Sequence, residues 1–194
     1  MNIFKRSYSV ENVDIDNIDK ELFYTSLLYS IGGIKKECKR IDKLIHSIAD
    51  RVYIPTGSLM DHYDAVIELA YMKRKLIELY KAFVEWYKTQ TTEDQKLCVA
   101  YFIKKDIALT KKIFHMADRS VYRYMPKMVK SFRSYIRLST TLDMELIKYP
   151  LIYSRYVYYR DKKYRYDICG LNGKKKEVNK YDHTTNERRH PSCL

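Results

Sequence analysis

The sequence has little of the punctuation that a fold made of many short strands needs. Only five glycines and four prolines occur in 194 residues, whereas a sandwich or barrel needs turn residues about every ten positions. Hydrophobic residues make up 46% of the chain, which suffices for the core of one domain, or of a small domain with an appendage. The sequence therefore predicts an all-α protein.

Long hydrophobic runs and paired cysteines are also missing. No stretch approaches the roughly 18 uncharged apolar residues of a membrane span, and residues 1–9 lack the apolar centre of a signal peptide. The four cysteines are widely and irregularly spaced, which favours reduced thiols: Cys38, Cys98, Cys169 and Cys193. We expect a cytoplasmic protein with no membrane partner.

Nothing in the sequence is typical of an active site. There is no glycine-rich phosphate loop and no grouping of serine, histidine and aspartate. Cys169, His183, His190 and Cys193 lack the close pairs of ligands that organise a zinc site. We expect no enzymatic activity, no catalytic residue, no cofactor and no metal.

Charge is distributed unevenly along the chain. Residues 1–100 hold 15 basic and 15 acidic side chains, and residues 101–194 hold 22 basic and nine acidic ones, so the second half carries the whole net charge of +13. A neutral scaffold joined to a basic end is the charge pattern of a protein that binds a polyanion.

The first half predicts an arm and a helical hairpin. Residues 1–33 are expected to form a loose arm and a short helix that begins near residue 18 and stops at Gly32-Gly33. Residues 34–90 are expected to form an antiparallel coiled coil that spaces or dimerises the protein, so a homodimer through this hairpin is a further expectation. Its two apolar stripes are Ile34, Cys38, Ile41, Ile45, Ile48, Val52, and Ala65, Leu69, Met72, Leu76, Leu79, Phe83, Trp86.

Residues 91–138 predict three helices. The segment Thr91–Gln95 has the composition of a helix cap, and the helix it opens is expected to close at Lys104-Lys105-Asp106. A second helix is expected over 107–115 and a tight turn over 116–118, followed by a basic helix that starts near Arg119. Pro126 is expected either to bend this last helix or to restart it.

The stretch 101–136, and most closely Ile113–Tyr124 (IFHMADRSVYRY), resembles the helix-turn-helix of sigma-factor region 4. With the preceding hairpin, residues 34–137 resemble the small sigma factor-like regulators of phages and prophages, including the ArpU-type late-gene activators. Where that family shows a small apolar pair, this chain has Thr110-Lys111. The resemblance implies a bacterial host cell and a helix placed in the major groove.

The resemblance and the residue types together suggest two sets of DNA contacts. Side chains at the start of the basic helix are expected to read bases: Arg119, Ser120, Tyr122, Arg123 and Tyr124. Basic side chains along and before this helix are expected to bind phosphates: Lys104, Lys105, Lys111, Lys112, Lys127, Lys130, Arg133 and Arg137.

The C-terminal quarter leaves two interpretations open. Residues 139–169 are expected to begin with a helix that Pro150 interrupts. The tyrosine alternation over 156–168 is compatible with a small β-hairpin, whereas the slightly favoured alternative packs the tyrosines on the helical core. Residues 170–194, with Lys174-Lys175-Lys176 and Arg188-Arg189, are expected to form a flexible basic tail.

Three functions are compatible with these features. The first is a sequence-specific DNA-binding transcription regulator of phage type, acting as an activator or as a sigma-like subunit that contacts RNA polymerase. The second is a protein-interaction module, such as a DNA-packaging subunit or an inhibitor of a host machine. The third is an RNA-binding protein that stacks bases on the tyrosine-rich segment.

Overall fold

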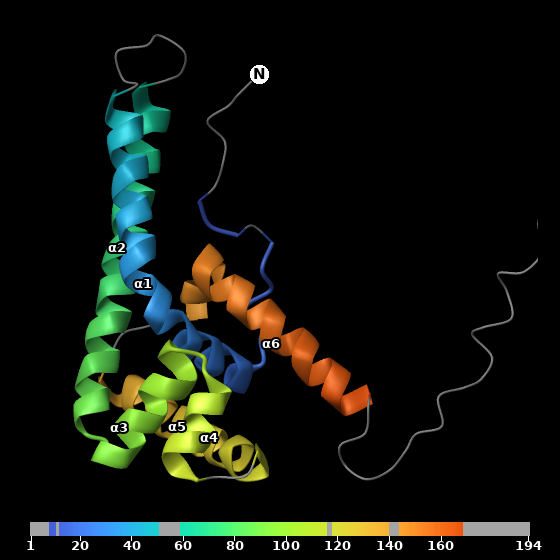
Figure 1. Ribbon diagram of the computed structural model, residues 1–194. Coiled ribbons are helices and arrows are strands. Elements are labelled where there is room, and N and C mark those ends of the chain that lie inside the picture. Colours follow the sequence, from blue (N-terminus) through green and yellow to red (C-terminus); the bar gives the residue numbers. More distant parts are fainter. Residues whose placement is uncertain (1–7, 11, 51–58, 116–117, 140–143, 169–194) are drawn as a thin grey trace, which may run out of the picture. The chain divides into compact units, whose positions relative to one another are not determined.

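The computed structural model describes residues 8–10, 12–50, 59–115, 118–139 and 144–168, and every regular element among them is helical (Figure 1). The described chain falls into two compact units, one ending at Tyr159 and one beginning at Arg160. Residues 156–168 are part of a helix, so the small β-hairpin that the sequence left open for them is wrong. Among the described residues no helix is long and apolar enough to cross a membrane.

Two long helices, α1 (Lys20–Ala49) and α2 (Leu59–Lys88), lie side by side and run in opposite directions (Figure 1). Their shared core contains Ile41 of α1 and Leu69 and Leu76 of α2, each fully buried. The ammonium of Lys73 bonds the Asp42 carboxylate at 2.6 Å across the same contact. The residues that would join the two helices, 51–58, lie outside the described part.

Helix α1 continues without interruption through the glycine pair at which the sequence predicts a stop. A Cβ on Gly32 would lie 3.3 Å from the carbonyl oxygen of Ile103, and one on Gly33 would lie 3.0 Å from a methyl of Leu151. The glycines therefore serve close packing of neighbouring elements, since α1 continues to Ala49 in an ordinary helix. The sequence pattern of a C-cap was misleading here.

The elements that follow α2 are short until α5. Thr91 caps α3 (Thr92–Cys98) by accepting from the N–H of Asp94, as the sequence predicts. A π-helical segment, η2 (Val99–Ile103), buries Ala100, Tyr101 and Phe102. Asp106 then caps α4 (Ile107–Phe114), and its carboxylate accepts from the N–H of Leu109 at 2.8 Å.

Helix α5 (Asp118–Ser139) is continuous through Pro126, so the proline does not restart it. A 3-10 helix, η3 (Met144–Lys148), precedes α6 (Pro150–Ile168), and Pro150 is the first residue of α6 instead of an interruption. Tyr149, just before α6, and Tyr153, Tyr156 and Tyr159 of α6 pack on the core, which is the favoured alternative, whereas Tyr158 is exposed. Tyr159 stacks on Tyr29 with ring centroids 4.2 Å apart, and Tyr149 and Tyr156 are buried.

The segment before α1 is not loose where it is described. The N–H of Val10 donates to the carbonyl of Lys148 at 2.7 Å. Ile18 is buried, and the N–H of Asp19 donates to the hydroxyl of Tyr156 at 3.2 Å. These contacts attach the segment to η3 and α6, which corrects the expectation of a free arm.

Candidate nucleic-acid interface

The inner side of α5 packs against α2. Met125, Met128, Val129, Phe132 and Ile136 are all at least 94% buried, and their spacing places them on one face of the helix. The Phe132 ring meets Trp86 with centroids 5.1 Å apart. The indole N–H of Trp86 donates to the Ser131 hydroxyl at 3.1 Å, so α5 is fixed in rotation about its own axis.

The outer side of α5 carries a shallow hollow, and its lining is cationic. The residues that line it are Lys130, Arg133, Ser134 and Arg137. They recur at intervals of three and four, which places them on one helix face. Three of the eight predicted phosphate contacts are thus brought together, and Lys127 lies exposed one turn earlier on α5.

Arg133 is held in place by an aromatic ring of another helix. Its guanidinium carbon lies 5.6 Å from the ring centroid of Tyr24 on α1, within the range of a cation–π contact. Lys130 and Arg137 are exposed. Among the residues that the structure describes, no carboxylate forms an ion pair with any of these three cations. The hollow therefore presents positive charge that no described carboxylate neutralises.

The predicted base-reading residues lie in the first turns of α5. The side chains of Arg119, Ser120, Tyr122 and Arg123 are outside the described part. Tyr124 is described: its hydroxyl donates to the Asp94 carboxylate of α3. This hydrogen bond, with partial burial, raises the pKa of Tyr124 to about 12. Tyr124 therefore links α5 to α3 in this structure.

The remaining predicted phosphate contacts belong to a different place in the chain. Lys104 and Lys105 lie between η2 and α4, and Lys105 has a left-handed backbone with φ 58°. Burial, followed by the nearby charge of Arg155, lowers the pKa of Lys105. Lys111 and Lys112 are in the last turn of α4. None of these four lines the hollow on α5.

Thr110 is a polar residue in the interior of the protein. The residue is fully buried, and its hydroxyl donates to the carbonyl of Asp106 at 2.7 Å. Because the hydroxyl is satisfied within its own helix, burial leaves no hydroxyl donor of this side chain unpaired. The threonine is thus compatible with close packing of α4.

Sequence reasoning missed three residues of this region. Ser134 could have been found, since it lies one turn from both Lys130 and Arg137. Tyr24 beneath Arg133 and Arg155 beside Lys105 are distant in sequence from their partners, and no local pattern indicates either contact.

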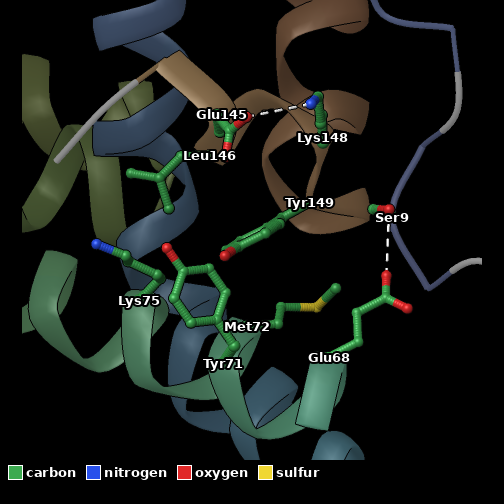
Figure 2. A pocket seen from close by; sticks show the side chains of 9 residues that line it. All are labelled: Ser9, Glu68, Tyr71, Met72, Lys75, Glu145, Leu146, Lys148 and Tyr149. Atoms are coloured by element: carbon green, nitrogen blue, oxygen red, sulfur yellow. Dashed lines mark hydrogen bonds and ion pairs between the residues drawn. The ribbon is translucent and has the colours of Figure 1, made fainter. Parts of the chain in front are cut away.

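A second hollow is lined by α2, η3 and the segment before α1 (Figure 2), and has a volume of about 150 Å³. Its lining contains both acidic and basic side chains, and some of them are bonded to each other or to a neighbour. The Ser9 hydroxyl donates to Glu68 at 3.2 Å, and the Lys148 ammonium lies 3.4 Å from the Glu145 carboxylate. Buried Met72 and Leu146 complete the lining. This mixed character does not favour a polyanion.

No group of three or more histidine, cysteine, aspartate or glutamate side chains that could hold a metal occurs within the described ranges. Comparisons with protein families, with curated proteins and with solved structures find no match.

Proposed function

We propose that this chain is a sequence-specific DNA-binding transcription regulator that lays the outer side of α5 along a duplex. The observation that carries the proposal is the cationic hollow of Lys130, Arg133 and Arg137 on one helix face. Phosphates are the ligands that such a row of flexible cations binds best.

The distribution of basic residues over the whole of α5 supports contact with a duplex. Six of its 22 residues are basic: Arg119, Arg123, Lys127, Lys130, Arg133 and Arg137. With 3.6 residues per turn, these six positions fall within one third of the helix circumference, beside the apolar positions that face α2. A helix with one apolar and one cationic side can pack on a core and contact a groove at once.

The connection between α4 and α5 adds a second line of support. Helix α4 ends at Phe114, His115 follows in a left-handed conformation with φ 49°, and α5 begins at Asp118. Three residues therefore separate two helices that contact each other, which is the spacing of a helix-turn-helix. In that arrangement the second helix enters the major groove, and its first residues, 119–123, meet base edges.

The RNA-binding alternative gains no support from the tyrosines. Tyr149, Tyr156 and Tyr159 are used in packing within the first unit, so their rings are not offered for stacking on bases. Tyr158 is 54% exposed. The side chains of Tyr164 and Tyr166 lie outside the described part, and among the described tyrosines of this segment one strongly exposed ring is a poor platform for successive bases.

Electrophoretic mobility shifts at several salt concentrations test the proposal. The variant Lys130→Ala/Arg137→Ala removes two exposed cations of the hollow, and should weaken binding to all duplexes and reduce the slope of log K against log salt by about 2. The matched control is Lys35→Ala/Lys39→Ala, which removes two exposed cations of α1. Equal losses in the two variants would contradict the proposal.

Sequence specificity needs its own measurement. Duplexes selected from a random pool at a stated salt concentration should share a motif, and Arg123→Ala should relax the preference at one or two positions. Lys130→Ala should instead weaken all sequences alike. If Arg123→Ala and Lys130→Ala behave identically on every duplex, the part of the proposal that concerns base reading is wrong.

A further inference from the structure

Helix α2 carries a second apolar stripe on the side away from α1. We define the outer stripe as Met60, Tyr63, Ile67, Ala70, Arg74 and Ile77. Met60 and Ile67 are each 65% exposed, and Tyr63 is 56% exposed. Scattered apolar residues on a surface are common, but a contiguous apolar stripe marks an interface.

The spacing of the outer stripe is that of a coiled coil. Its positions alternate in steps of three and four, so they form one seam along the helix. The residues that α2 buries in the core, such as Leu69, Met72, Leu76 and Leu79, fall on the opposite side of the same helix. One helix thus has two seams, and the described part of the chain covers only the inner one.

Charge along α2 indicates what covers the outer seam. Residues 59–70 hold Asp61, Asp64 and Glu68 without a lysine or arginine, whereas residues 71–81 hold Lys73, Arg74, Lys75 and Lys81 with Glu78 as the one carboxylate. An antiparallel second copy of α2, paired about residues 68 and 69, would set the acidic segment of each copy against the basic segment of the other. A partner of another kind would have to reproduce the same reversed order of charge.

We propose that the outer stripe is a two-fold homodimer interface in which two α2 helices pack in opposite directions. A two-fold axis between residues 68 and 69 sets Met60 across from Ile77, Tyr63 across from Arg74 and Ile67 across from Ala70 of the second copy. The residues of the outer stripe alternate between the a and d positions of a heptad. In an antiparallel coiled coil an a position of one helix faces a d position of the other, and each of these three pairs has this form.

Arg74 is the one charged residue of the outer stripe, and this arrangement places it beside two residues of the second copy. Arg74 of one copy lies over the Tyr63 ring of the other, which suits a cation–π contact, and is next to the other copy's Asp64. Asp64 is exposed, and Arg74, with a side chain 77% exposed, now reaches only Glu78 of its own helix among the described carboxylates. Small Ala70 opposite Ile67 lets the helices approach. The interface needs no DNA, so its failure would leave the proposed function untouched.

Sedimentation equilibrium of the full chain without DNA tests the interface. The wild type should show a concentration-dependent dimer, and Ile67→Asp should raise the dissociation constant at least about 30-fold. The control Tyr158→Asp changes an equally prominent exposed ring on α6 and should leave the dimer intact. Circular dichroism melting shows whether each variant folds. A wild type that is monomeric at every concentration would overturn the proposal, since another occupant would then cover the stripe.

Charge reversal tests the pairing. Asp64→Arg and Arg74→Asp should each weaken self-association, because each places like charges across the interface twice. An equimolar mixture of the two variants should restore a dimer, since every contact then joins opposite charges. A mixture that stays monomeric would contradict the predicted pairing.

Cross-linking tests the direction of the helices. A chain with Met60→Cys mixed with a chain with Ile77→Cys should form a disulfide between these two positions, identified by mass spectrometry of the peptides. Met60→Cys alone should give no cross-link between two copies of position 60. The reverse result would indicate parallel helices and overturn the proposed two-fold axis.

Discussion

Helices α2 and α5 are alike on their inner sides and differ on their outer sides. Each buries a continuous apolar face, and the two faces meet where Phe83 and Trp86 of α2 contact Phe132 of α5. Outside, α2 carries an apolar stripe with exposed Met60 and Ile67, whereas α5 carries cations. The inner residues therefore determine how the helices pack, and the outer residues determine what each helix offers to a partner.

The shared inner contact gives the largest expected effect. Phe132 is fully buried, so Phe132→Ala should lower the free energy of unfolding by about 3–5 kcal/mol. Urea denaturation followed by circular dichroism measures it. Tyr80→Ala, at an exposed ring of α2 (46% exposed), is the control and should change stability by less than about 0.5 kcal/mol. Similar losses in both variants would mean that α5 does not depend on this contact.

Next in size is the hydrogen bond between the two helices. Ser131→Ala removes the acceptor of the Trp86 indole N–H and should cost about 1–2 kcal/mol, because the indole is 1% exposed and its donor is left unpaired. Ser134→Ala, on the outer side of the same helix, should leave stability unchanged. Urea denaturation of the two variants compares the two sides of α5. Equal stabilities of Ser131→Ala and Ser134→Ala would contradict the prediction that only the inner side contributes.

A smaller effect depends on pH. Tyr124→Phe removes the hydrogen bond to Asp94 and should cost about 1 kcal/mol at neutral pH. The folded pKa of Tyr124 is raised to about 12 from the ordinary 10, so its contribution is fully present below pH 10 and is lost as the pH rises through 12. The stability difference between wild type and Tyr124→Phe should therefore shrink from pH 10 to pH 12. A constant difference over this range would contradict the assignment.

The smallest expected effect lies on the outer side of α2. Arg74 and Glu78 form an exposed ion pair at 3.0 Å, so Arg74→Ala should change the free energy of unfolding by less than about 0.5 kcal/mol in a chain kept monomeric by Ile67→Asp. In the otherwise wild-type chain the same change should cost more, because the dimer contact is lost too. Equal costs in the two backgrounds would mean that Arg74 has no role outside its own helix.

Local patterns in the sequence were good guides to the start of helices. The sequence predicts the cap at Thr91, whose side-chain oxygen accepts from the N–H of Asp94. It also predicts a helix from residue 107, although it assigns Asp106, the cap of that helix, to the end of the preceding one. The spacing of Lys130, Arg133 and Arg137 likewise indicated one face of one helix. These features could be predicted because neighbouring residues decide the caps and helix periodicity decides the shared face.

Contacts between distant segments explain the failures. Gly32 and Gly33 were read as a stop, but Ile103 and Leu151 lie against them, and no local pattern contains that information. The tyrosines of α6 alternate like a strand over a few residues, whereas Tyr149, Ile152, Tyr156 and Tyr159 recur at helical spacing and pack on the core. Burial of a helix face outweighed the strand propensity of tyrosine.

The only tryptophan of the sequence lies directly under α5, with its ring on Phe132 and its N–H on Ser131. Its intrinsic fluorescence therefore reports on a single place in the protein, the contact between α2 and α5, the helix that carries the cationic hollow. A ligand that shifts or tightens α5 should change the emission without any added dye. Tryptophan emission can therefore be used to follow ligand binding at α5.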